Sequence, residues 1–188
     1  MGGALHRLRR AAGNLRSNPR AFARRVLAWA RAAVALRGCT RGRSVCTYGR
    51  VRVTNRGRIE IGDRVTFVEG VIASELVCHE GALLSIGEET TLNYAASIEA
   101  SAEVRIGRRC MLASFVRLGD RDRTRVAPIA VGDDVWLAHG VVVEPGVTIG
   151  SGSVVAAGSV VTSDVPPGSL ASGNPARSMP LALSGAKS

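Results

Sequence analysis

The chain has 188 residues, 46% of them hydrophobic and only 4% aromatic, and a formal net charge of +10 at pH 7. This length predicts one domain with appended segments, and no stretch approaches the ~20 apolar residues of a membrane-spanning helix. The charge is uneven, since residues 1–59 contain 15 arginines and no acid, whereas residues 60–188 contain 10 Lys or Arg and 15 acids. The basic balance therefore belongs to the front segment, and the rest of the chain is mildly acidic.

Residues 1–38 predict a basic amphipathic helical segment that Pro19 divides in two. The first half repeats Leu5, Leu8, Ala12 and Leu15 at helical spacing, and the second aligns Phe22, Val26, Trp29, Ala30 and Ala33 on one face. Such a helix pair fits an anionic membrane surface. Alternatively, the apolar face packs on the end of the domain or on a sister subunit. Arg31 interrupts the apolar run and argues against a secretory signal, and no aromatic-interleaved basic motif indicates a nucleic-acid partner.

From residue 61 onward an 18-residue unit recurs. It begins at the pairs Ile61-Gly62, Ile86-Gly87, Ile106-Gly107, Val131-Gly132 and Ile149-Gly150. Their spacings of 25, 20, 25 and 18 residues are the unit with insertions of 7, 2, 7 and 0. The last units divide into sixes, with aliphatic residues at Val131, Leu137, Val143, Ile149, Val155 and Val161 and small or β-branched residues at Val135, Val141, Val147, Ser153 and Ser159. A period of six indicates a parallel β-helix, in which each segment forms one side of a triangular turn.

The repeat predicts an all-β domain over residues 39–166, preceded by the helical segment 1–38 and followed by a C-terminal tail, 167–188. One turn cannot bury its inward aliphatic side chains alone, so successive turns must stack about 4.8 Å apart. The glycines of the repeat suit corners that need positive φ or close approach of the backbone.

The four cysteines, Cys39, Cys46, Cys78 and Cys110, form no C-x-x-C pair and have no metal-ligand spacing with histidine. Cys110 falls on a small inward position of its turn and is expected in the core. The four are expected to be reduced thiols of a cytosolic protein, peripheral on the inner face of the cytoplasmic membrane if the front segment binds lipid.

Residues 131–177, from Val-Gly-Asp-Asp-Val-Trp-Leu-Ala-His-Gly to Gly-Asn-Pro-Ala-Arg, closely resemble the hexapeptide-repeat acyltransferases, nearest to the maltose and galactoside O-acetyltransferases and their polysaccharide-modifying relatives. The likeness extends over about residues 59–177. It implies a left-handed parallel β-helix, a homotrimer, and acyl-CoA bound between neighbouring subunits. It also implies direct acyl transfer to a hydroxyl group, deprotonated by a histidine on an extended loop. No metal is implied.

Residue by residue, the resemblance assigns CoA contacts to Trp136, His139, Ala157, Thr162, Ser163 and Arg177, and an acceptor contact to Asn93. Trp136 also fits a corner aromatic at a subunit interface, and Asn93 a polar corner residue. His139 fits a wall of the CoA site, a plain exposed corner, or a base in contact with Ser114, which occupies the equivalent place one turn earlier.

The extended loop corresponds to the insertion around Asp120 to Pro128, and the family's histidine falls on Arg123. Arginine stays protonated and cannot act as a general base near neutral pH. Asp122 lies on the same loop, but neighbouring arginines should keep its carboxylate ionised and weakly basic. His79 is expected to be exposed.

Three functions are compatible with this architecture. The first is an acyl-CoA-dependent O-acyltransferase, using acetyl-CoA or another acyl-CoA on a sugar or lipid-linked glycan of envelope polysaccharide. The second is a member of the same fold without catalysis, acting as a scaffold or CoA-binding partner. The third, a zinc enzyme of this architecture, would need three converging imidazoles, whereas the body holds only His79 and His139, in different registers.

Overall fold

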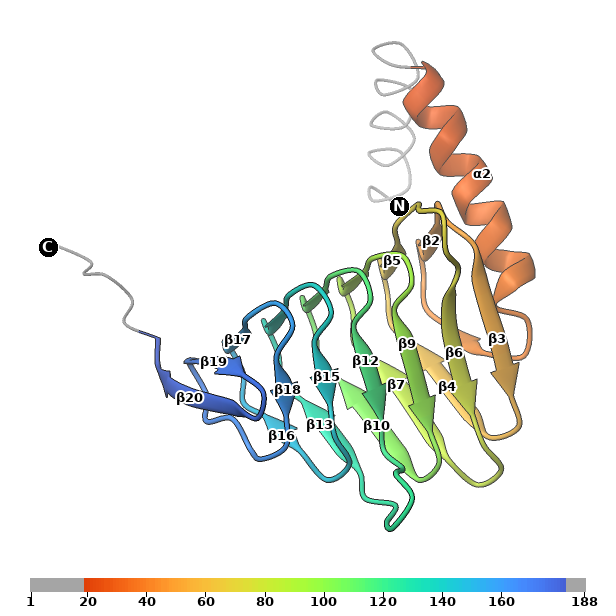
Figure 1. Cartoon of the computed structure of the whole chain (residues 1–188). Helices are drawn as coiled ribbons and strands as arrows, with labels where there is room; N and C mark the ends of the chain where they lie inside the picture. Colours follow the sequence, from red (N-terminus) through yellow and green to blue (C-terminus); the bar gives the residue numbers. More distant parts are fainter. Residues whose placement is uncertain (1–18, 182–188) are drawn as a thin grey trace, which may run out of the picture.

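The computed structural model describes residues 19–181, which form one helix followed by a left-handed parallel β-helix (Figure 1). In Figure 1 the strands of the front sheet run downwards while the coil advances to the left, towards its C-terminal end. The predicted all-β class and left-handed coil are confirmed, as is a helix ahead of the coil that begins at Pro19. The first half of the predicted front segment lies outside the described residues.

Three sheets form the sides of the coil, and the strands from β1 to β18 belong to sheets A, B and C in turn. Sheet A contains β1 (Thr40–Arg41), β4 (Arg58–Ile61), β7 (Leu83–Ile86), β10 (Glu103–Ile106), β13 (Ile129–Val131) and β16 (Thr148–Ile149). Sheet B contains β2 (Cys46–Thr47), β5 (Thr66–Phe67), β8 (Thr91–Leu92), β11 (Met111–Leu112), β14 (Trp136–Leu137), β17 (Val154–Val155), β19 (Ser169–Gly173) and β20 (Ala176–Pro180). Sheet C contains β3 (Val51–Asn55), β6 (Ser74–Cys78), β9 (Ser97–Ala100), β12 (Arg117–Gly119), β15 (Val142–Val143) and β18 (Val160–Val161).

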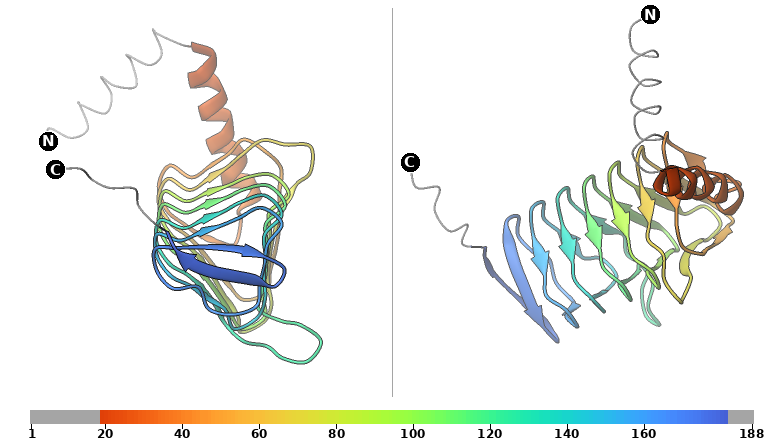
Figure 2. Two further views of the ribbon diagram at one scale, coloured as in Figure 1. Left: turned by 60° about the vertical axis from the view of Figure 1, so that its left-hand side comes forward. Right: turned by 90° about the horizontal axis from the view of Figure 1, so that it is seen from above.

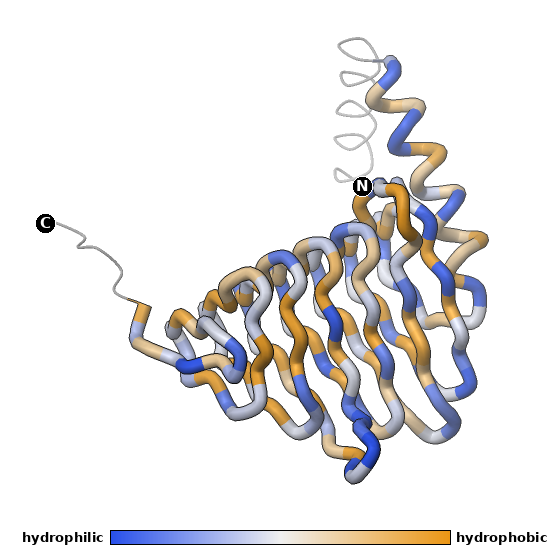
Figure 3. The backbone as a smooth tube through the Cα atoms, in the orientation of Figure 1, coloured by the Kyte–Doolittle hydropathy of each residue, from blue (hydrophilic) through white to orange (hydrophobic). Residues whose placement is uncertain are grey.

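The inward columns follow the six-residue period of the sequence. The six predicted aliphatic positions between Val131 and Val161, and the five small or β-branched positions between them, are all buried. Cys110 is also buried, with 2% of its surface exposed, and the four cysteines are free thiols. Figure 3 shows that hydrophobic and hydrophilic residues recur from one turn of the coil to the next.

The repeat glycines serve two different purposes. Gly62, Gly87, Gly107, Gly132 and Gly150 stack on one another, and an added Cβ at each would meet the next rung at 2.3–2.6 Å. These glycines are therefore required for close approach of the backbone. By contrast, Gly140, Gly146, Gly152 and Gly158 have φ between 68° and 81° and occupy the left-handed corner positions.

Charged residues occupy the equivalent left-handed positions of the earlier rungs at the corner between sheets A and B. Arg64, Glu89, Arg109 and Asp134 have φ between 52° and 60° there. Two ion pairs join them across rungs, since Arg64 Nη2 lies 2.5 Å from Glu89 Oε1 and Arg109 Nη2 lies 2.6 Å from Asp134 Oδ2. The Arg109 guanidinium lowers the pKa of the Asp134 carboxyl below its ordinary value, mainly through this hydrogen-bonded pairing.

Helix α2 (Pro19–Ala35) covers the N-terminal end of the coil. Its buried residues are Ala28 and Ala32, and Leu36 just beyond the helix continues the same stripe. Ala32 and Leu36 join the core cluster that contains Val45 of the first rung. The small alanines allow the helix to approach that rung closely.

The apolar face predicted for this helix is not the face that packs on the coil. Val26 and Trp29 are 49% and 52% exposed, Ala30 is exposed, and Phe22 and Ala33 are only half-buried. Only the narrow stripe from Ala28 to Leu36 packs on the end of the domain, which was one of the expected roles. Most of the larger apolar side chains of α2 are exposed.

Two further features modify the regular coil. The insertion at residues 120–128, between β12 and β13, projects from the corner between sheets C and A, as Figures 1 and 2 show. At the other end, β19 and β20 form an antiparallel hairpin that continues sheet B and closes the last rung.

Replacing Gly87 with alanine should destabilise the coil, because the new methyl group would lie 2.5 Å from the carbonyl carbon and oxygen of Gly107. Overpacking of this kind costs about 1–3 kcal/mol, measurable as a lower midpoint of urea unfolding. Gly119→Ala is the matched control, since its methyl group meets nothing within 4 Å. Equal midpoints for the two variants would contradict the close-approach role.

Candidate functional site

The corner between sheets B and C carries one column of side chains. Strands β8, β11, β14 and β17 of sheet B each end on an inward residue. The residue two positions later lies at this corner, which gives the column Tyr94, Ser114, His139 and Ala157. Ser114 Oγ lies 3.0 Å from His139 Nδ1, so the predicted contact between these residues is confirmed. The ring of Phe115 lies 5.3 Å from that of His139 and 5.7 Å from that of Tyr94, the latter pair edge to face. The imidazole is thereby held between a hydroxyl and an aromatic ring.

Beside this corner, the outward face of sheet B is apolar. Trp136 and Met111 pair in register on neighbouring strands, and each is 49% exposed. Asn93 lies at the same corner, half-buried, and Ala157 is exposed one rung beyond His139. The structure thus brings Asn93, Trp136, His139 and Ala157 to one edge of the coil. A flat apolar wall next to a hydroxyl–imidazole pair suits a ligand with both apolar and polar parts.

The opposite edge of sheet C holds a second imidazole. His79 Nε2 lies 2.8 Å from Glu99 Oε1, and both side chains are about half exposed. The expectation of a simply exposed His79 is therefore incomplete. No pattern in the sequence points to this contact, because Glu99 pairs in register with Val77 and reaches His79 diagonally. An ionised carboxylate only accepts hydrogen bonds, so Nε2 carries the proton and Nδ1 of the neutral ring keeps its lone pair.

The inserted loop begins beside this pair. Glu99 pairs in register with Gly119, and the next residue, Asp120, is fully buried. The Asp120 carboxylate accepts hydrogen bonds from the backbone N–H groups of Ser101, Ala102 and Glu103 at 2.6–2.7 Å. Backbone hydrogen bonds between Asp120 and Ala127 and between Asp122 and Arg125 close the loop into a tight hairpin. The loop therefore has a fixed base on the edge that carries His79 and Glu99.

Asp122 stabilises the loop itself. Its Oδ1 accepts hydrogen bonds from the Thr124 N–H and hydroxyl and from the Arg125 N–H, at 2.6–2.9 Å. These bonds, the Thr124 hydroxyl first, lower the pKa of the Asp122 carboxyl below its ordinary value. The ionised Asp122 carboxylate therefore stabilises the folded chain at pH values above about 3.9, the ordinary pKa of Asp in the unfolded chain. This contribution is lost as the pH falls through the lower pKa of Asp122 in the folded chain. Asp122 is accordingly ionised and weakly basic at neutral pH.

The arginines of the loop differ in their contacts. Arg125 donates a hydrogen bond to the Pro145 carbonyl. Arg121 and Arg123 are exposed and form no ion pair with any carboxylate of residues 19–181. The loop therefore presents two guanidinium groups to solvent.

The remaining predicted contacts lie at the C-terminal end of the coil. Thr162 and Ser163 are exposed directly after β18, and Arg177 is exposed on β20, in register with Ser172. Within one chain, sheet C separates the loop-edge residues Asp122 and Arg123 from the Trp136–His139 edge. The predicted site residues thus do not form a single cluster in one chain.

Neither a metal cluster nor a membrane-spanning helix is found in the described part of the chain. In the stretch 19–181, no group of three or more His, Cys, Asp or Glu side chains is arranged to hold a metal ion. No helix within that stretch has the length and hydrophobicity to cross a membrane.

Residues 128–163 match the family model described as bacterial transferase hexapeptide (six repeats). Nodulation protein L of Rhizobium meliloti (strain 1021) is 40% identical over 118 residues, which are 57% of this chain and 64% of that protein. The chain spans less than two thirds of the length of the curated relatives that it matches first.

Solved structures show the same architecture. A hexapeptide-repeat-containing acetyltransferase of Vibrio cholerae O1 biovar eltor, in complex with acetyl coenzyme A, is 26% identical, with a TM-score of 0.56 over 95% of this chain and 88% of that one. A mutant of the GDP-perosamine N-acetyltransferase of Caulobacter crescentus, in complex with CoA and GDP-perosamine, is 29% identical, with a TM-score of 0.56 over 72% of this chain and 56% of that one. The resemblance to the hexapeptide-repeat acyltransferases is confirmed.

Asp120→Asn should loosen the loop, because an amide offers one acceptor oxygen where the carboxylate serves three backbone donors. Leaving buried donors unsatisfied costs about 1–3 kcal/mol, so urea unfolding should shift to lower concentration and hydrogen exchange at residues 101–103 should accelerate. Asp122→Asn is the control on the same loop, and it should leave hydrogen exchange at residues 101–103 unchanged, because Asp122 binds Thr124 and Arg125 and not these residues. Identical behaviour of the two variants would show that Asp120 does not anchor the loop.

Proposed function

We propose that this chain, which shares its coil and its hexapeptide repeats with the acetyltransferases named above, is an acyl-CoA-dependent O-acyltransferase. The observation that carries the proposal is the Trp136–His139 edge, a preformed apolar and polar wall on a coil whose relatives were crystallised with CoA or acetyl-CoA. Acetyl-CoA is the donor proposed first. The acceptor class is a sugar or a lipid-linked glycan, in keeping with the sugar nucleotide bound by one relative.

The donor is assigned to the edge between sheets B and C. Trp136 flanks the pantetheine arm, with His139 and Ala157 along the same wall and Thr162 and Ser163 as further contacts. Arg177 binds a phosphate group of CoA, since a guanidinium can grip a phosphate with two hydrogen bonds. Asn93 contacts the acceptor.

The acceptor chemistry is assigned to the loop edge of a neighbouring copy. Sheet C separates the two edges within one chain, so a homotrimer, which the resemblance implies, would bring the loop edge of one copy to the donor edge of the next. Arg123 and Arg121 then offer positive charge toward the diphosphate of the donor or of a sugar nucleotide. Asp122 keeps the loop folded.

His79 is the best-supported base. Its Nε2–H is held by Glu99, which orients the ring and stabilises the imidazolium that forms. Nδ1 takes the proton of the acceptor hydroxyl while the hydroxyl oxygen attacks the thioester carbonyl carbon. The carbon–sulfur bond then breaks, and the CoA thiolate takes the proton back to leave as the thiol, with the acyl ester as the other product.

The chain with acetyl-CoA and a panel of saccharide and glycolipid acceptors should release free CoA thiol above the rate in buffer. Under the alternative, a catalytically silent scaffold or CoA-binding partner, no acceptor releases thiol, although acetyl-CoA can still raise the melting temperature. The variant Arg123→His further distinguishes a loop that lacks its base from a site in which His79 is the base. A gain of about two orders of magnitude would mean that the loop merely lacks its base, and no gain is expected if His79 already supplies it.

His79→Ala should lower kcat by a factor of ~10²–10⁴ with the melting temperature nearly unchanged, because the side chain is half exposed. Free imidazole should restore part of the rate, which a purely structural role would not allow. His139→Ala is the comparison and should raise the KM for acetyl-CoA more than it lowers kcat. Rescue of His139→Ala instead, with full activity in His79→Ala, would assign the base to the other edge.

A further inference from the structure

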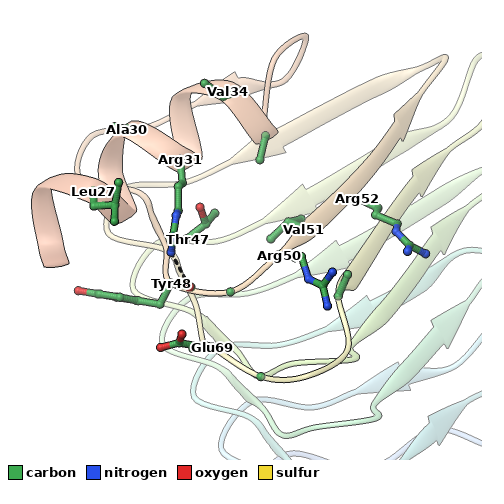
Figure 4. A pocket seen from close by; sticks show the side chains of 14 residues that line it. Leu27, Ala30, Arg31, Val34, Thr47, Tyr48, Arg50, Val51, Arg52 and Glu69 are labelled. Carbon is green, nitrogen blue, oxygen red and sulfur yellow. Dashed lines mark hydrogen bonds between the residues drawn. The ribbon is translucent and has the colours of Figure 1, made fainter.

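A groove separates α2 from the first strand of sheet C, at the N-terminal end of the coil. Its volume is about 790 Å³, within the range of sites for small molecules. Leu27, Ala30 and Val34 of α2 form one wall, and Tyr48, Gly49 and Val51 lie on the other (Figure 4). Leu27 and Val34 are 51% and 61% exposed although they line this apolar space. The groove is therefore an open hydrophobic surface.

Two arginines give the groove positive charge. Arg31 reaches across from α2 and donates a hydrogen bond to the Tyr48 carbonyl at 3.3 Å, and Arg50 donates to the Val71 carbonyl at 2.9 Å. Neither guanidinium pairs with a carboxylate of residues 19–181. The one acidic lining residue, Glu69, is already paired with Arg24 at 3.0 Å, and Arg52 is paired with Glu75 at 3.3 Å. Arg31 and Arg50 consequently retain donors for an anion.

A second, smaller depression adjoins the groove and shares Arg50, Arg52 and Ala73 with it. It is lined by Val71 and Ile72, which lie on the loop before β6 and are 84% and 51% exposed. Apolar side chains thus flank Arg50 on both sides. Exposed aliphatic residues around guanidinium groups that lack a carboxylate partner match the chemistry of an anionic amphiphile.

Charge argues against the other occupants. Residues 1–18 contain four arginines and no acid, so this segment would bring like charge to Arg31 and Arg50. A second copy docked symmetrically on the same surface would place these arginines opposite themselves, which is repulsive. An anionic ligand has no such penalty.

We propose that this groove binds one anionic membrane phospholipid. The phosphate lies on Arg31 and Arg50, and an acyl chain lies along Leu27, Ala30, Val34 and Val51. Occupation of the groove would hold the α2 end of the coil at a lipid surface. This proposal does not depend on the transferase assignment, which concerns other residues.

The test uses the full chain and two probes. Below its critical micelle concentration, dihexanoyl phosphatidylglycerol should bind with a stoichiometry of one lipid per chain in calorimetry. The protein should also co-sediment with vesicles of phosphatidylglycerol and phosphatidylcholine. The double variant R31Q/R50Q should weaken both by about tenfold or more. R20Q/R56Q removes the same charge from exposed arginines outside the groove and should leave short-chain lipid binding intact. If both double variants lost the same lipid affinity, the binding would be general electrostatic attraction, and the proposal would be overturned.

A second matched pair tests the apolar wall. L27Q should weaken binding of the short-chain lipid, whereas V26Q, with a similarly exposed residue outside the groove, should not. If inorganic phosphate bound as tightly as the lipid, the groove would be only an anion site, and the proposal of a phospholipid ligand would be overturned. In sedimentation velocity, a fall in oligomer mass in L27Q with unchanged lipid binding would instead assign the groove to contact between copies of the chain.

Discussion

The stacking of one rung on the next is the interaction on which the rest of this structure depends. A single rung buries nothing by itself, because its inward aliphatic side chains meet partners only in the rungs above and below. The stack of Gly62, Gly87, Gly107, Gly132 and Gly150 allows the backbones to approach closely enough for these columns to form. The regular register then determines which outward side chains become neighbours. Ser114 meets His139, and Trp136 lies beside Met111, because the coil repeats and not because these residues are near in sequence.

The same regularity explains what could be predicted from the sequence. The six-residue period determined the inward positions from Val131 to Val161, and the stacking of Ser114 on His139 followed from their equal distances from the start of their repeats. The His79–Glu99 contact could not be predicted, since it runs diagonally between neighbouring positions and depends on side-chain reach. The stripe of α2 that packs on the coil could not be derived from hydrophobicity either. Hydrophobicity favoured Val26 and Trp29, whereas close packing on the first rung selected the small Ala28 and Ala32.

The proposed function assigns donor binding to one edge of the coil and the catalytic base to another. In the proposal, the edge between sheets B and C would hold the donor. The other edge carries the His79–Glu99 pair and the inserted loop, which buried Asp120 anchors. A transferase built from such edges needs a second copy to join them, so assembly and catalysis would be coupled. In that arrangement Arg123 would supply positive charge for a phosphorylated ligand, and the base would come from another residue.

Hydrogen–deuterium exchange of the full chain, with and without acetyl-CoA, tests most directly whether the two edges form one donor site. We expect slower exchange on ligand addition at residues 136–141 and 154–158, and also at the inserted loop, residues 119–128, which would face the donor from the adjacent copy. Protection that is absent from the inserted loop, or confined to α2 and the first rung, would contradict a donor site shared between copies.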